Sequence, residues 1–110
     1  MQAGGRRIRI VSAPLYLATK IAAFSGRGGG DYFGSKDMED IVALLDGRVA
    51  LGEECRQGEG TVAVFVRSWA KTLMARDDLR DVLAAHVSRS GGADRWRVVL
   101  ERVRRLAELQ

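Results

Sequence analysis

The alternation of hydrophobic and polar positions predicts a chain that is mainly helical. From residue 12 onward, apolar side chains recur every three or four positions, which is the repeat of a helix that buries one face. Gly, Pro, Ser and Asp residues at the ends of these runs provide helix start and stop signals. We expect about six helices, at residues 12–24, 35–46, 49–57, 61–75, 77–87 and 94–109.

Individual residues mark where these helices begin and which face they bury. Ser12 and Ser35 are predicted N-caps, and Pro14 suits a first turn because its missing N–H would be unpaired there anyway. Thr61 is the predicted cap of the helix at 61–75. The expected apolar stripe of that helix consists of Val62, Phe65, Val66, Trp69 and Leu73.

Residues 7–11 show the only convincing strand pattern in the sequence. Basic and apolar residues alternate there, and the run ends in β-branched side chains. A single strand has no hydrogen-bonding partner within this chain, and even an isolated two-stranded hairpin is only marginally stable. We therefore expect the strand at 7–11 to pair with a second copy of the chain, giving a homodimer, or with another polypeptide such as an N-terminal half-protein.

Composition and charge narrow the classes of function without selecting one. The chain has 110 residues, the length of one domain, and a formal net charge of +4, which permits a phosphate-bearing partner such as nucleic acid without requiring one. A single cysteine, Cys55, excludes an internal disulfide and a multi-cysteine zinc site. No apolar run approaches the roughly 20 residues that span a bilayer, and the N-terminus lacks the apolar core of a secretory signal. We expect a cytoplasmic protein that does not enter a membrane.

Polar chemistry is concentrated between the first two predicted helices. Residues 25–34 contain five glycines, which free the backbone for turns and for close approach to a ligand or a neighbouring chain. The second helix then opens with Lys36, Asp37 and Asp40, and its two aspartates, three positions apart, share one face. Lys20 belongs to a first helix that is otherwise almost wholly apolar. This stretch is where we expect the function to lie.

The same stretch resembles a known family. Four blocks carry the resemblance, in this order: SAPLYLATKIAAF at 12–24, an Arg-Gly loop with Gly30-Asp31-Tyr32, SKDMEDI at 35–41, and DGR at 46–48. Their order and spacing are similar to the C-terminal half of AbiEii/AbiGii-type nucleotidyltransferases, which include the toxins of toxin–antitoxin and abortive-infection systems. The resemblance covers residues 7–48 well, and residues 49–110 only in helical character.

The resemblance implies an activity that this chain alone would lack. Proteins of this family transfer a nucleotide from an NTP and use Mg²⁺ held by an upstream Asp-x-Asp pair, which follows a strand and a Gly-Gly or Gly-Ser helix start. That pair matters because metal ions neutralise the charge that develops on the phosphates. This sequence contains no Asp-x-Asp pair. We therefore expect the chain by itself to bind neither Mg²⁺ nor NTP and to be inactive until such a segment completes it.

The resemblance also implies a fold and a partner. Residues 1–110 are expected to form a single domain, the C-terminal helical part of an α/β nucleotidyltransferase-like fold. Within it, residues 1–48 form the motif region and residues 49–110 a helical bundle. An antitoxin is an expected partner if the chain acts as a toxin of this type.

Candidate site residues follow from the same resemblance. Those expected to be catalytic are Lys20, Lys36, Asp37 and Asp40. Those expected to bind the nucleotide are Arg27 and Asp31, and no residue is assigned to a metal. The residues themselves leave an alternative open, in which Lys20 forms an ion pair with Asp37 or Asp40 that joins the first two helices. The two aspartates would then serve as acids in the first turns of a helix, where the helix dipole favours them.

A second function, of a different class, also stays open. A stand-alone helical module would dimerise through the strand at 7–11 and bind a protein or a nucleic acid. The arginines of the last helix are compatible with RNA binding, although an ordinary solvated basic face has the same spacing. These arginines are Arg95, Arg97, Arg102, Arg104 and Arg105. His86 lies among apolar residues and is expected to be a partly buried helix residue, since no nucleophile is placed by sequence to pair with it.

Overall fold

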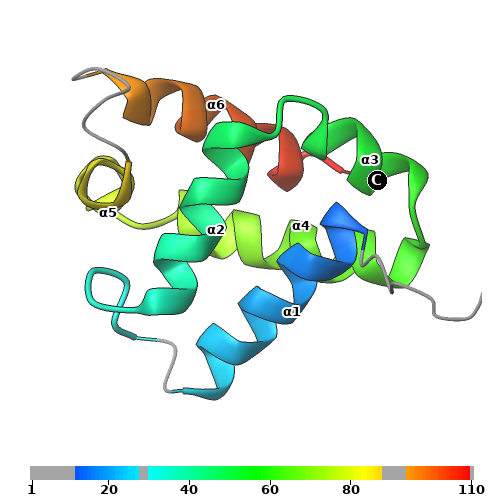
Figure 1. Ribbon diagram of the computed structural model, residues 1–110, viewed down its shortest axis with the longest axis horizontal. Helices are drawn as coiled ribbons and strands as arrows, with labels where there is room; N and C mark the ends of the chain where they lie inside the picture. The colour runs from blue at the N-terminus through cyan, green and yellow to red at the C-terminus, as the bar shows by residue number, and fades with distance from the viewer. Residues whose placement is uncertain (1–11, 28–29, 88–93, 110) are drawn as a thin grey trace, which may run out of the picture.

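The regular structure of the described part of the chain is helical. The computed structural model describes residues 12–27, 30–87 and 94–109. Six helices occur in these residues (Figure 1): α1 (Ala13–Gly26), α2 (Lys36–Gly47), α3 (Leu51–Gln57), α4 (Gly60–Met74), α5 (Leu79–His86) and α6 (Arg95–Ala107). These three ranges contain no strand, so the mainly α fold class is confirmed for them. Each helix in them is too short or too polar to cross a lipid bilayer.

The predicted strand at 7–11 lies outside the described residues. The homodimer or half-protein expected to pair with it therefore stays a prediction. The described elements are all helices, so they give no support to the α/β part of the predicted nucleotidyltransferase-like fold.

Serine caps start the first two helices, as the sequence predicts. The Oγ of Ser12 accepts a hydrogen bond from the backbone N–H of Leu15 at 3.3 Å, and the Oγ of Ser35 accepts one from Met38 at 3.2 Å. Each cap satisfies a backbone donor that has no partner inside the helix. The two caps therefore fix where α1 and α2 begin.

The start of α4 differs from the prediction. Thr61 is not its cap, because the helix already begins at Gly60, and the carbonyl of Glu59 accepts its first helical hydrogen bond from Ala63 at 3.0 Å. Glu59 occupies the N-cap position without a side-chain hydrogen bond. Thr61 consequently lies inside the first turn.

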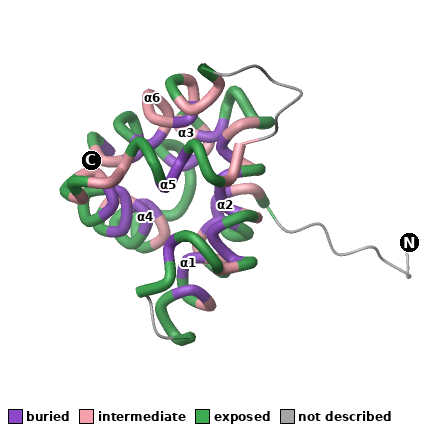
Figure 2. The backbone as a smooth tube through the Cα atoms, turned by 90° about the vertical axis from the view of Figure 1, so that its left-hand side faces the viewer, coloured by how far each residue is buried: buried purple, intermediate pink, exposed green. Residues whose placement is uncertain are grey.

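The core forms around α4, which packs against both α6 and α1, while α2 packs against the same two helices. Figure 2 shows that the buried positions lie on the sides of the helices that face one another. Aliphatic side chains fill this core, as the small number of aromatic residues requires. Its largest fully buried members are Leu17, Ile21, Met38, Ile41, Leu45, Leu51, Leu73, Leu83, Leu106, Val42, Val66 and Val82.

Phe65 was expected in the apolar stripe of α4, and this prediction is wrong, because its side chain is 41% exposed. The buried face of the helix is instead centred on Ala63, Val66, Ala70 and Leu73. Phe65 directly precedes Val66, and successive residues of an α-helix project about 100° apart, so its side chain points away from the centre of this face.

Tyr32 anchors the connection between α1 and α2. Its ring is buried and packs edge-to-face against Phe24, with the ring centroids 4.9 Å apart. The guanidinium of Arg76 lies 3.9 Å from the centre of the same ring, and the Nε2 of His86 contacts the Tyr32 carbonyl at 2.8 Å. His86 is half-buried, as predicted. These contacts hold the segment before α2 against α1, α5 and the α4–α5 connection.

Cys55 lies in the core on α3. Burial, with a smaller contribution from the charge of Glu54, raises the pKa of its thiol to about 11. The thiol is therefore neutral at ordinary pH and acts as a small hydrophobic side chain rather than a nucleophile.

Candidate functional site

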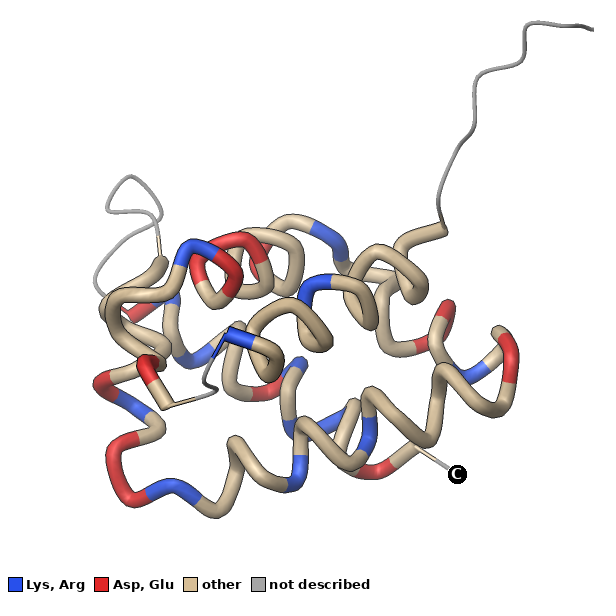
Figure 3. Tube along the Cα trace, turned by 90° about the horizontal axis from the view of Figure 1, so that it is seen from below, with Lys and Arg blue, Asp and Glu red and all other residues tan. Residues whose placement is uncertain are grey.

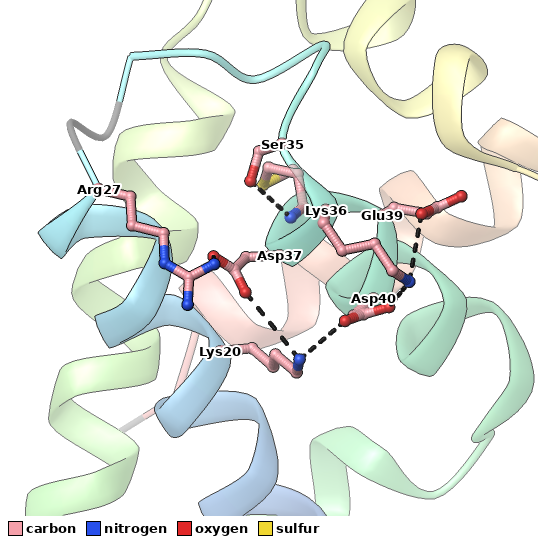
Figure 4. Close-up of polar contacts among 8 residues, drawn as sticks. Lys20, Arg27, Ser35, Lys36, Asp37, Glu39 and Asp40 are labelled. Carbon is pink, nitrogen blue, oxygen red and sulfur yellow. Dashed lines mark hydrogen bonds and ion pairs between the residues drawn. The ribbon is translucent and has the colours of Figure 1, made fainter.

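The candidate site lies where the second half of α1 meets the first turns of α2 (Figure 4). The Nζ of Lys20 donates to the Oδ2 of Asp40 at 2.8 Å and lies 3.9 Å from the Oδ1 of Asp37. The two aspartates therefore share a face of α2, as their spacing predicts. The ion pair that was left open as an alternative for Lys20 is present, and it joins α1 to α2.

Asp37 is the only charged side chain that is buried among the described residues, with 4% of its surface exposed. The Nη1 of Arg27, which is the C-cap residue of α1, lies 3.4 Å from the Oδ2 of Asp37, and Lys20 faces the other oxygen. The first turn of α2 adds the positive end of a helix dipole. Two cations and this dipole together offset the cost of taking the carboxylate out of water.

Lys36, the first residue of α2, is the third cation of the cluster. Its Nζ lies 2.7 Å from the Oδ1 of Asp40 and 3.3 Å from the Oε1 of Glu39. Asp40 therefore has one lysine on each carboxylate oxygen. Hydrogen bonds from Lys20 and Lys36 hold the pKa of Asp40 below its usual range, and the same bonds raise the pKa of both lysines. All three groups are charged at neutral pH.

The lowered pKa of Asp40 makes the α1–α2 contact sensitive to acid. A carboxyl group whose pKa is lower in the folded state adds stability above its unfolded pKa of about 3.9, and this stability is lost as the pH falls through the folded pKa. We expect Asp40→Asn to lower the free energy of unfolding at pH 7, and the difference from the wild type to shrink at pH 3. Urea unfolding at the two pH values measures this. If the variant and the wild type differed by the same free energy of unfolding at pH 7 and at pH 3, the assigned ion pairs of Asp40 would be contradicted.

Asp31 belongs to a turn rather than to this cluster. Its Oδ1 accepts a hydrogen bond from the backbone N–H of Gly34 at 2.8 Å, which closes the turn before α2. A Cβ at position 34 would lie 2.6 Å from the Oδ2 of Asp31, so a larger residue there would displace this carboxylate. The ion pairs found among the described residues do not include Asp31. Its role in nucleotide binding stays a prediction.

The geometry limits what the cluster can bind. Each of the four aspartate oxygens faces a cation, so these carboxylates are a poor environment for Mg²⁺. The described part of the chain also contains no group of three or more His, Cys, Asp or Glu side chains that could hold a metal ion. Lys36 and Arg27 have 72% and 74% of their side chains exposed. Their free donors suit an oxyanion such as phosphate.

Two arginines of α6 bind the C-terminal end of α2. This contact, which we call the clamp on α2, was not predicted from the sequence. The Nη1 of Arg102 donates to the carbonyls of Leu45 and Asp46 at 2.7 Å each. Arg95 binds the carboxylate of Asp46 and donates to its carbonyl at 3.1 Å. The prediction of a plain solvated face is therefore wrong for these two residues. The one available signal was the Asp46-Gly47 helix end, whose carbonyls need donors.

The remaining arginines of α6 pair with acidic residues near them in the sequence. Arg104 contacts Glu101 and Glu108, Arg105 contacts Glu101 at 3.4 Å, and Arg97 lies 3.8 Å from Asp94. These pairs reduce the positive charge that α6 presents to RNA. Figure 3 shows the same interleaving of basic and acidic residues over the other helices. The nucleic-acid alternative therefore gains no specific support.

Fold and site together define a small helical protein in which a network of ion pairs joins the first two helices. No protein-family model, curated protein or solved structure matches this chain. The resemblance to AbiEii/AbiGii-type enzymes therefore rests only on the four sequence blocks between residues 12 and 48.

Proposed function

We propose that this chain is the helical C-terminal part of a nucleotidyltransferase-like protein and contributes basic groups to a phosphate-handling site. The observation that carries this proposal is the convergence of three cations on two aspartates at one helix junction, within the segment that resembles the family. Lys20 lies in the middle of α1, Arg27 is the C-cap of the same helix, and Lys36 is the first residue of α2. The exposed cations of this cluster, Arg27 and Lys36, offer the kind of donors that bind phosphate oxygens.

The residues of the cluster divide into two roles. Arg27 and Lys36 are exposed, and we assign them contact with the phosphate oxygens of an NTP. Asp37 and Asp40 orient these cations, and Lys20 is held between the two carboxylates. The Mg²⁺ that the family uses would neutralise charge on the phosphates, and its ligands would come from an Asp-x-Asp segment rather than from these aspartates. If the protein is a toxin of this type, an antitoxin is its partner.

A transfer assay tests the proposal directly. With Mg²⁺ and labelled NTPs, the isolated chain is expected to transfer no nucleotide, because it lacks the carboxylate pair. Joined to an in-frame upstream segment with Gly-Gly or Gly-Ser followed by Asp-x-Asp, it is expected to become active. Robust transfer by the isolated chain, or none by the joined protein, would contradict the proposal.

Side-chain variants of the joined protein test the assigned roles. Replacing both Arg27 and Lys36 by alanine is expected to lower transfer by about 100-fold, because charge-stabilising donors commonly contribute that much. Lys71→Ala, which removes an exposed lysine from α4, serves as the matched control and should leave transfer unchanged. If the double variant and Lys71→Ala lowered transfer equally, the overall charge of the protein would matter rather than the position of Arg27 and Lys36.

A further inference from the structure

A hollow of about 290 Å³ opens between α3 and α6, and four of its ten lining residues are arginines. Its charged lining residues are Arg48, Arg56, Arg102, Arg105, Glu53 and Glu108, so arginines outnumber carboxylates by four to two. None of these residues belongs to the α1–α2 cluster. The volume lies at the lower end of the range of small-molecule sites, which points to a small ligand.

The arginines of this hollow differ in how fully they are paired. Glu54 binds Arg48 through two nitrogens, and Glu53 binds Arg56 in the same way. Arg102 contacts two backbone carbonyls, and no carboxylate among the described residues lies within 4.0 Å of its nitrogens. An arginine has five N–H donors, so most of those on Arg102 stay available.

Arg105, which lies three positions after Arg102 on α6, is the most weakly paired arginine of the hollow among the described residues. Its contact with Glu101 is long, at 3.4 Å, and the carboxylate of Glu101 also forms an ion pair with Arg104. Each guanidinium group has the planar fork of donors that fits a phosphate or carboxylate group, and both residues line the hollow. Glu54 and Glu101 pair with Arg48 and Arg105 from outside the lining, so four carboxylates face the four arginines, and a ligand would be held by the donors of Arg102 and Arg105 rather than by a net positive charge.

Apolar residues line the same hollow. Leu51 and Leu109 are buried beside it, and Val49, which lies between α2 and α3, is 80% exposed at its edge. An adjoining hollow of about 460 Å³ shares Val49, Arg102 and Arg105 with the first. A single exposed valine is ordinary on a protein surface. Together with Leu51 and Leu109, however, Val49 gives the hollow an apolar side that an apolar group of a ligand would contact.

We propose that the α3–α6 hollow binds a phosphate monoester whose other end is apolar or aromatic. Arg102 and Arg105 bind the phosphate, and Val49, Leu51 and Leu109 contact the apolar part. This site is separate from the α1–α2 cluster and does not depend on the function proposed for it.

Titration of the full chain with phenyl phosphate, followed by backbone amide NMR, tests the site. We expect saturable shifts at residues 48–56 and 101–109, with a Kd of about 1 mM or tighter. Inorganic phosphate should bind about tenfold more weakly, because it lacks the apolar group. Shifts confined to residues 27 and 35–40 would overturn the proposal, since they would assign phosphate binding to the other cluster. Binding of an oligonucleotide with no response to phenyl phosphate would overturn it as well.

Three variants locate the binding groups. Arg105→Gln is expected to weaken phenyl phosphate binding about tenfold, whereas Arg104→Gln, its neighbour outside the hollow, should leave binding unchanged. Val49→Ser should weaken binding of phenyl phosphate but not of inorganic phosphate. All three positions are exposed, so the fold should tolerate these changes. Unchanged affinity in Arg105→Gln, or equal losses in the two arginine variants, would overturn the proposed site.

Discussion

Replacing Leu73 by alanine is expected to lower the free energy of unfolding by about 3 kcal/mol. Leu73 is fully buried on α4, the helix that packs against both α6 and α1. Shortening its side chain removes apolar contacts and leaves a cavity, because helices packed on both sides cannot close the space without moving one another. Urea unfolding followed by circular dichroism measures the loss.

Val64→Ala is the matched control for this substitution, because Val64 lies on the same helix with half of its side chain exposed. We expect it to change the free energy of unfolding by less than about 0.5 kcal/mol. A loss of less than about 1 kcal/mol for Leu73→Ala would contradict the central position of α4. Equal losses at the two positions would contradict the assigned burial.

The helices could be predicted because each shows a local signal in the sequence. Apolar residues at helical spacing give the buried face, and the serine side chains at positions 12 and 35 form the expected hydrogen bonds with the first turns. Phe65 and Thr61 were assigned wrongly for one physical reason. Which apolar residues are buried, and where a helix starts, depend also on the helices packed against it, and the pattern of one helix does not contain that information.

Part of the candidate site could be predicted in the same way. Asp37 and Asp40 lie on one face of α2 because of their spacing, and Lys20 stood out as a charge on an apolar helix. These features suffice to predict their ion pairs, which the structure contains. A ligand cannot be inferred from the same features, because these charges neutralise one another whether or not phosphate binds. The hydrogen bond from Gly34 to Asp31 likewise satisfies that carboxylate without a nucleotide.

The clamp on the C-terminal end of α2 could not be predicted. Arg95 and Arg102 lie 49 to 57 positions from the residues they contact, and no periodic pattern relates them. Together with Lys20 and Arg27 at the opposite end, they hold α2 by charged contacts at both ends. This arrangement fixes the helix that carries Asp37 and Asp40, and so links α6 to the geometry of the candidate site.

Replacing Arg102 by alanine is consequently expected to lower the free energy of unfolding by about 2 kcal/mol. The change removes two hydrogen bonds from a charged donor and leaves the carbonyls of Leu45 and Asp46 with fewer donors at a helix end. Arg102→Lys should recover part of the loss, because an ammonium group keeps the charge but not the planar fork. Urea unfolding of the two variants, compared with the wild type, measures both effects.

Arg104 provides the control on the same helix, because it pairs with exposed glutamates and does not contact α2. Arg104→Ala should leave stability unchanged within experimental error, as is usual for surface ion pairs. If Arg102→Ala were equally neutral, the hydrogen bonds from Arg102 to the end of α2 would add nothing to stability. A large loss that Arg102→Lys recovers in full would instead mean that charge at the end of α2 matters, and that the paired hydrogen bonds of the guanidinium do not.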